Sequence, residues 1–168
     1  ATAALGATRE ALRSFTIDAG VDVFTFGGTK TGVMFGEAVI FFNTDLAKRS
    51  LYIRKQSTQL YSKMRFISSQ YLAFLKNDLF IELGVASNSA AKSLYAEVQN
   101  IEMLQLTATP AVNSIYPVLE PSVSKALQDW SFFWDWDEAT HQVRWMTAWD
   151  VDHSDIALFV AGLKSLLG

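Results

Sequence analysis

The first part of the chain alternates short apolar runs with polar stretches, which predicts strands between helices. Residues 21–26 and 37–42 are runs rich in Val, Ile and Phe, separated by a glycine-marked loop, and such runs are typical of buried strands. Both runs are apolar on both faces, as strands are inside a layered α/β sheet. Residues 3–14 carry helix formers, and residues 43–56 open with three good N-cap residues and continue as a helix.

The middle of the chain has the spacing of amphipathic helices. Residues 62–83 predict one long helix, and residues 87–99 predict another after Gly84. The apolar positions of the long helix recur every three to four residues: Met64, Ile67, Tyr71, Phe74 and Leu75. A polar interruption at residues 57–62 precedes this helix and predicts a seam between domains 1–58 and 59–168.

After Asn100 the pattern becomes α+β. Two strands are expected around Pro110, then a helix with Pro121 near its start, where proline is tolerated. Residues 132–150 predict an aromatic hairpin, and Asp152 is a suitable cap for a final helix.

Composition restricts the class of protein. Half of the 168 residues are apolar and 18% are charged, which is globular and allows one domain or a little more. The net charge of −3 and the lack of a basic tract argue against nucleic acid as a partner. The absence of cysteine excludes disulfides and thiolate metal sites, and no metal site is expected. No apolar run is long enough for a membrane span, and the first residues resemble no signal peptide, so the cytoplasm is the expected location.

Lys30 is the most informative single cation, because it lies in the loop between the two expected strands. It could be a solvated loop lysine, as most lysines are. A phosphate-binding loop is disfavoured, since Thr29 rather than glycine precedes Lys30 and a strand rather than a helix follows. It could also be a Schiff-base lysine of a pyridoxal phosphate enzyme, for which nearby glycines such as Gly28 would let the cofactor approach the backbone.

The segment "DVFTFGGTKTGVMFGEAVIFF" at residues 22–42 resembles the cofactor-lysine segment of bacterial threonine aldolases. These enzymes belong to the aromatic amino acid β-eliminating lyase/threonine aldolase family, and the resemblance continues through "YIRKQ", "SKMRF" and "VRWMTAWDV". It implies the α/β fold of pyridoxal enzymes of the aspartate aminotransferase type. Lys30 would then form the Schiff base, with Gly28 and Thr29 beside the cofactor.

Arg144 is the second candidate, on an expected strand among apolar residues. Taken alone it could be an edge arginine whose stem covers apolar surface. The resemblance instead implies that Arg144 binds the substrate α-carboxylate, for which a guanidinium offers two parallel hydrogen bonds. Its neighbours depart from the more familiar "R-L-V-T-H" form of the family.

Three further basic residues, Lys55, Lys63 and Arg65, resemble the family segment that reaches a neighbouring subunit's active site. A solvated basic helix face explains them equally well. His141 and His153 match no catalytic histidine and are expected at the surface, and the five tryptophans are interpreted as core and interface aromatics.

The resemblance implies a lyase that cleaves a β-hydroxy-α-amino acid, such as threonine or allo-threonine, to glycine and an aldehyde. The chain would be the C-terminal half of the enzyme: residues 1–58 would end the large cofactor domain, and residues 59–168 would form the small domain. A homo-oligomer, dimer or tetramer, is expected, and the chain without its N-terminal half should be inactive. The open alternatives are β-elimination on another amino acid, or a non-catalytic fragment with an assembly or binding role.

Overall fold

A computed structural model describes residues 2–6 and 8–168, which form two compact units, Thr2–Leu83 and Gly84–Gly168. The predicted boundary at residue 58 divides the domains of a complete protein, which is a different division from these two units, and it stays a prediction. Within the described residues, no helix has both the length and the apolar character needed to cross a membrane.

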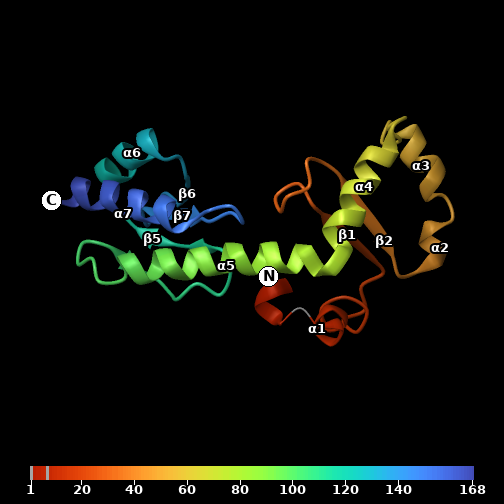
Figure 1. Ribbon diagram of the computed structural model, residues 1–168, viewed down its shortest axis with the longest axis horizontal. Coiled ribbons are helices and arrows are strands. Elements are labelled where there is room, and N and C mark those ends of the chain that lie inside the picture. Colours follow the sequence, from red (N-terminus) through yellow and green to blue (C-terminus); the bar gives the residue numbers. More distant parts are fainter. Residues whose placement is uncertain (1, 7) are drawn as a thin grey trace. The chain divides into compact units, whose positions relative to one another are not determined.

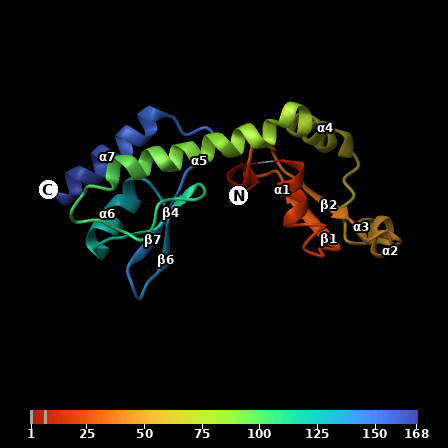
Figure 2. The same cartoon turned by 90° about the horizontal axis from the view of Figure 1, so that it is seen from below.

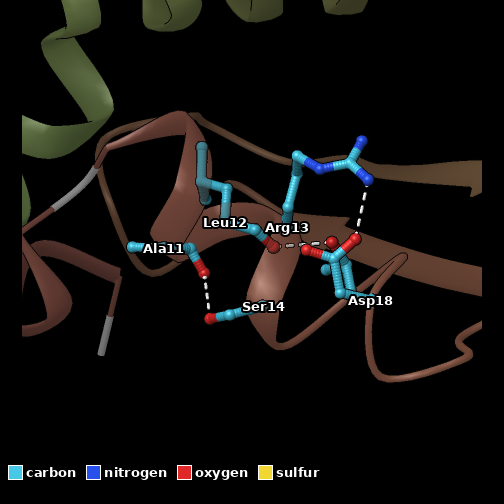
Figure 3. Close-up of polar contacts among 6 residues, drawn as sticks. Ala11, Leu12, Arg13, Ser14 and Asp18 are labelled. Carbon is cyan, nitrogen blue, oxygen red and sulfur yellow. Dashed lines mark hydrogen bonds and ion pairs between the residues drawn. The ribbon is translucent and has the colours of Figure 1, made fainter.

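The N-terminal unit begins with a short 3-10 helix, Thr2–Leu5, and α1, Arg9–Ser14. The single helix predicted for residues 3–14 is therefore wrong, since Gly6 adopts a φ of 87°; Ala7 lies outside the described residues. The Thr8 hydroxyl accepts from the Ala11 amide at 3.1 Å and caps α1. Bonds from the side chains of Ser14, Thr16 and Arg13 close the far end of α1 (Figure 3).

The two predicted strands are confirmed as β1, Val23–Gly27, and β2, Glu37–Phe41. They pair antiparallel, from Val23 opposite Phe41 to Gly27 opposite Glu37. One face of the hairpin packs on α4, where the Phe26 ring centroid lies 5.7 Å from that of Phe74 (Figure 1). On the other face the side chains are open, and Val39 is 53% exposed.

The helices of the N-terminal unit are more divided than the sequence predicts. The helix expected at residues 43–56 consists of α2, Thr44–Ala47, and α3, Ser50–Gln56. The following helices are α4, Met64–Leu75, a 3-10 turn, η2, Lys76–Asp78, and α5, Leu79–Val98. The break lies at Asn77, whose φ of 54° is one that asparagine tolerates, and not at Gly84 as expected. Gly84 lies inside α5, where a glycine weakens a helix without ending it.

The C-terminal unit is built on an antiparallel sheet with β7, Gln142–Met146, at its centre. Its other strands are β3, Gln105–Leu106; β4, Ser114–Ile115; β5, Pro117–Val118; and β6, Trp134–Asp137. The sheet path is β3-β5-β7-β4, and β6 pairs with β7 as the predicted aromatic hairpin. The strands expected around Pro110 are thus confirmed, although they are short.

Helices cover this sheet and form the core with it (Figure 2). They are the second part of α5; α6, Pro121–Trp130; and α7, His153–Leu167. Fully buried side chains come from all of these elements, for example Val98, Leu127, Val143 and Leu163. Of the tryptophans, Trp145 is buried at 3% exposure, whereas the other four are exposed.

Asp152 caps α7 as predicted, in a complete capping box. Its carboxylate accepts from the Ser154 hydroxyl at 2.6 Å and from the Asp155 amide at 3.0 Å, while the Asp155 carboxylate accepts from the Asp152 amide at 3.0 Å. The hydrogen bonds that the Asp152 carboxylate accepts, first from the Ser154 hydroxyl and then from the Asp155 and Ser154 amides, lower the pKa of Asp152.

The core cluster lies entirely in the C-terminal unit, whereas the buried apolar side chains described in the N-terminal unit are Val33, Ile67 and Phe74. For the 168-residue chain alone we therefore expect amide exchange in residues 132–149 to be at least about a hundredfold slower than in residues 21–42, or about 3 kcal/mol. Hydrogen-exchange mass spectrometry on the monomer measures both segments. Equal, strong protection would show that the N-terminal unit is stable by itself.

The cap of α7 gives a pH-dependent prediction. The stabilisation from ionised Asp152 is present above its unfolded-state pKa, about 3.9, and is lost as the pH falls through the lower folded-state pKa. Asp152→Ala should therefore lower the melting temperature at pH 7, and the deficit should shrink toward pH 2. Asp152→Asn retains a capping oxygen but has no titrating group. Its deficit in melting temperature should therefore depend on pH differently from that of Asp152→Ala. Thermal melts of the three proteins at both pH values test this.

Candidate functional site

Lys30 lies in the turn between β1 and β2, with an exposed side chain. The turn is closed by its own backbone: the Gly28 carbonyl accepts from the Thr31 amide at 2.9 Å and from the Val33 amide at 3.1 Å. Lys30 is therefore held at the tip of a tight loop, residues 28–36, which we call the lysine loop. Gly28 and Thr29, the other two predicted cofactor residues, directly precede Lys30 in the same loop.

Glycines allow this loop to fold. A Cβ on Gly28 would lie 2.5 Å from Cγ2 of Val33, whose side chain is buried under the loop. Gly36, at the other end, has a φ of 135°, and a Cβ there would lie 2.9 Å from Cγ2 of Ile67 in α4. Any side chain at these two positions would force the lysine loop or α4 to move.

Two residues of α4 that have no functional role in the prediction from sequence hold the lysine loop in place. The Tyr71 hydroxyl accepts from the Gly28 amide at 3.1 Å and lies within donor distance of two carbonyls, that of Gly36 at 2.8 Å and that of Phe26 at 3.1 Å. The Gln70 side-chain oxygen accepts from the Met34 amide at 2.8 Å. Burial raises the pKa of Tyr71, so the phenol keeps its hydrogen at neutral pH.

Arg144 lies on β7 as predicted, half-buried, in the C-terminal unit. Its Nε and Nη2 are each 3.4 Å from the hydroxyl of Ser114 on β4, and Nη2 also lies 3.1 Å from the sulfur of Met146. Its guanidinium carbon is 5.4 Å from the centre of the Trp136 ring on β6, within cation–π range. Nη1 takes no part in these bonds, so the guanidinium has donors left for an anionic ligand.

Neither Lys30 nor Arg144 belongs to an ion pair among the residues that the structure describes. Lys30 lies in the N-terminal unit and Arg144 in the C-terminal unit, and each is held by contacts within its own unit.

The remaining candidates are exposed. Lys55 lies near the end of α3, Lys63 immediately before α4, and Arg65 in the first turn of α4. The Arg65 guanidinium carbon lies 4.8 Å from the centre of the Phe66 ring. His141 and His153 are also exposed, as expected.

A surface cavity of about 250 Å³ lies in the C-terminal unit, among residues that include Pro121, Lys125 and His141. Neither Lys30 nor Arg144 lines this cavity. Among its lining residues, Lys125 is the one lysine or arginine. Over residues 2–6 and 8–168, no group of histidine and acidic side chains could hold a metal ion.

The lysine loop fits the attachment point of pyridoxal phosphate. Such a cofactor needs a primary amine that can reach its aldehyde and a backbone that leaves room beside it. Lys30 supplies an exposed amine, and Gly28, two residues before it, carries no side chain.

No family model matches the chain. Two curated proteins are similar to it, both named low specificity L-threonine aldolase. The one from Pseudomonas aeruginosa is 33% identical over 152 residues, which cover 89% of this chain and 43% of that protein. The one from Pseudomonas sp. is 31% identical, over 99% of this chain and 47% of that protein. The chain therefore spans somewhat less than half the length of these relatives.

Solved structures agree. Threonine aldolase from Leishmania major superposes with a TM-score of 0.77 at 30% identity, over 90% of this chain and 45% of that one. Glycine decarboxylase superposes with a TM-score of 0.51 at 16% identity, over 94% of this chain and 37% of that one, which supports the fold alone. These likenesses confirm the predicted fold class, the pyridoxal-enzyme fold of the aspartate aminotransferase type, of which the chain is a part. The chain is related to the threonine aldolases and matches a segment of them.

Proposed function

We propose that the complete protein carrying this chain is a pyridoxal phosphate-dependent lyase that cleaves a β-hydroxy-α-amino acid, threonine or allo-threonine, to glycine and an aldehyde. The observation that carries the proposal is the position of Lys30. In a chain 33% identical to an L-threonine aldolase, it lies exposed at the tip of a glycine-bearing loop between two strands.

When bound, pyridoxal phosphate would supply an electron sink for the negative charge left at the substrate Cα after the Cα–Cβ bond breaks. Lys30 Nζ would be the atom that holds the cofactor. Gly28 and Thr29 would lie beside the cofactor. Arg144 would hold the substrate α-carboxylate and so fix which bond at Cα is cleaved.

Arg144 suits this role because its guanidinium is already oriented. Ser114 lies beside one edge and Trp136 under one face. Neither partner is a carboxylate, so a bound carboxylate would not have to displace an existing ion pair.

Several wider features are part of the proposal. The chain would be the C-terminal half of the enzyme, with residues 1–58 completing the cofactor domain and residues 59–168 forming the small domain. The protein would be a cytoplasmic homo-oligomer, dimer or tetramer, in which Lys55, Lys63 and Arg65 face a neighbouring subunit. The names of the relatives favour aldol cleavage over β-elimination, for which the same lysine and cofactor would serve.

The covalent role of Lys30 is tested by trapping. We expect borohydride reduction of the complete, cofactor-loaded protein to fix pyridoxal on Lys30, since its amine is exposed at the loop tip. Peptide mapping by mass spectrometry locates the adduct. Lys30→Ala should lose the adduct and keep its fold, and Lys55→Ala is the matched control that should keep both. An adduct on Lys55 or Lys63 in the unsubstituted protein would refute the assignment.

The role of Arg144 is tested by substrate affinity. Loss of a bidentate partner from a desolvated carboxylate costs about 2–5 kcal/mol, so Arg144→Ala should weaken amino-acid binding at least about tenfold. Cofactor binding should change little. Arg144→Lys keeps the charge but not the paired donors. Its affinity for the amino acid should therefore lie between that of Arg144→Ala and that of the unsubstituted protein. Titration with glycine, followed by the cofactor's visible absorbance, measures this affinity, and an unchanged value would leave Arg144 as an edge arginine.

A further inference from the structure

We propose that Tyr71 is a positioning residue for Lys30: its hydroxyl ties the two ends of the lysine loop to α4 and so sets where the lysine amine is presented. The inference rests on the proposed role of Lys30 and adds to it a residue for which the sequence suggested only packing.

The lysine loop needs external support. Within residues 28–36, the backbone bonds that the structure gives are the two made by the Gly28 carbonyl, to Thr31 and Val33. They close the half of the loop that carries Lys30. The other half, residues 34–36, is bonded to α4 instead, through Met34 to Gln70 and through Gly36 to Tyr71.

Tyr71 is the residue that joins the two halves. One oxygen atom contacts the Gly28 amide, where the loop begins, and the Gly36 carbonyl, where it ends. The Phe26 carbonyl, at the end of β1, lies 3.1 Å from the same oxygen. A hydroxyl can accept and donate at once, which an apolar ring of the same shape cannot do.

The ring itself is fixed by packing. It meets the Phe26 ring at a centroid distance of 6.2 Å and the Phe74 ring at 6.3 Å, both edge to face. It also lies against Gly36, where a Cβ would come within 3.1 Å of Cε2 of Tyr71. The hydroxyl position is therefore determined by the core of the N-terminal unit, and the loop is fitted to it.

Tyr71→Phe separates positioning from packing, because it keeps the ring and removes only the hydroxyl. Gly28 is buried, so its amide would lose a partner that water cannot readily replace. We expect the lysine loop to open at least about tenfold more often, since one lost bond of this kind is worth about a decade or more in an equilibrium.

The experiment uses the complete protein. Tyr71→Phe is compared with Tyr52→Phe, which also removes a tyrosine hydroxyl. Tyr52 lies in α3, is 71% exposed, and takes no part in the hydrogen bonds that hold the lysine loop. Hydrogen exchange of the cofactor-free proteins reports on residues 28–36, and on residues 132–149 as an internal check of folding. Pyridoxal phosphate titration with borohydride trapping then gives the cofactor concentration that half-saturates Lys30.

In Tyr71→Phe we expect exchange in residues 28–36 to rise at least about tenfold and the half-saturating concentration at Lys30 to rise by a similar factor. Lys55 should stay unlabelled, exchange in residues 132–149 should stay unchanged, and Tyr52→Phe should match the unsubstituted protein throughout. Faster exchange with unchanged saturation of Lys30 would overturn the inference, because Tyr71 would then only stabilise the fold. Unchanged exchange would overturn it as well.

Gln70→Ala gives a second test if Tyr71→Phe does not fold. It removes the acceptor for Met34 at a half-buried position and should loosen residues 34–36 and weaken saturation of Lys30 by a smaller factor. Saturation equal to that of the unsubstituted protein would count against the support of the loop by α4. An adduct outside Lys30 in the unsubstituted protein would instead refute the proposed function, whatever the exchange data show.

Discussion

The contact between the β1–β2 hairpin and α4 is the interaction on which the candidate site depends. Phe26 packs against Phe74 and Phe80, and the Tyr71 hydroxyl bonds to backbone groups at both ends of the lysine loop. The aromatic contacts bury apolar surface but are not directional, whereas the hydrogen bonds of the hydroxyl fix the orientation of the loop backbone. Since the lysine loop has few bonds of its own, its shape is imposed on it by the helix.

The C-terminal unit holds Arg144 by different means. β7 is paired on both sides and lies in the core through Val143 and Trp145, so its backbone is fixed. Side chains on a strand alternate between faces, and Arg144, between these two buried residues, points to the opposite face. There Trp136 and Ser114 orient the guanidinium without neutralising it. The position of Lys30 thus depends on a loop and the hydroxyl that holds it, whereas the position of Arg144 depends on the pleat of a sheet.

The sequence predicted the elements that rest on local signals. The apolar runs gave β1 and β2 within two residues, Pro121 marked the start of α6, and Asp152 with Asp155 marked the capping box of α7. It placed the helix break wrongly, because Gly84 is a stronger local signal than Asn77, whereas the chain turns where its packing requires it. Lys30 is proposed as the cofactor residue because the pattern of glycines around it resembles a known one. Tyr71 was counted among the apolar positions of its helix, since a tyrosine that packs and a tyrosine that also bonds to a loop have the same spacing. Only the fold shows that Gly28 and Gly36 both meet its hydroxyl.

The two-stranded hairpin has a further consequence. Among the described residues β1 and β2 pair only with each other, so each strand has one side whose backbone amides and carbonyls face no neighbouring strand. Exposed edges of this kind readily accept a strand from another chain, and the apolar open face adjoining them favours the same event. Self-association of this chain in isolation would then arise from edge pairing in a concentration-dependent manner. A mass measured for such an assembly would describe these edges and not the quaternary structure of the complete protein.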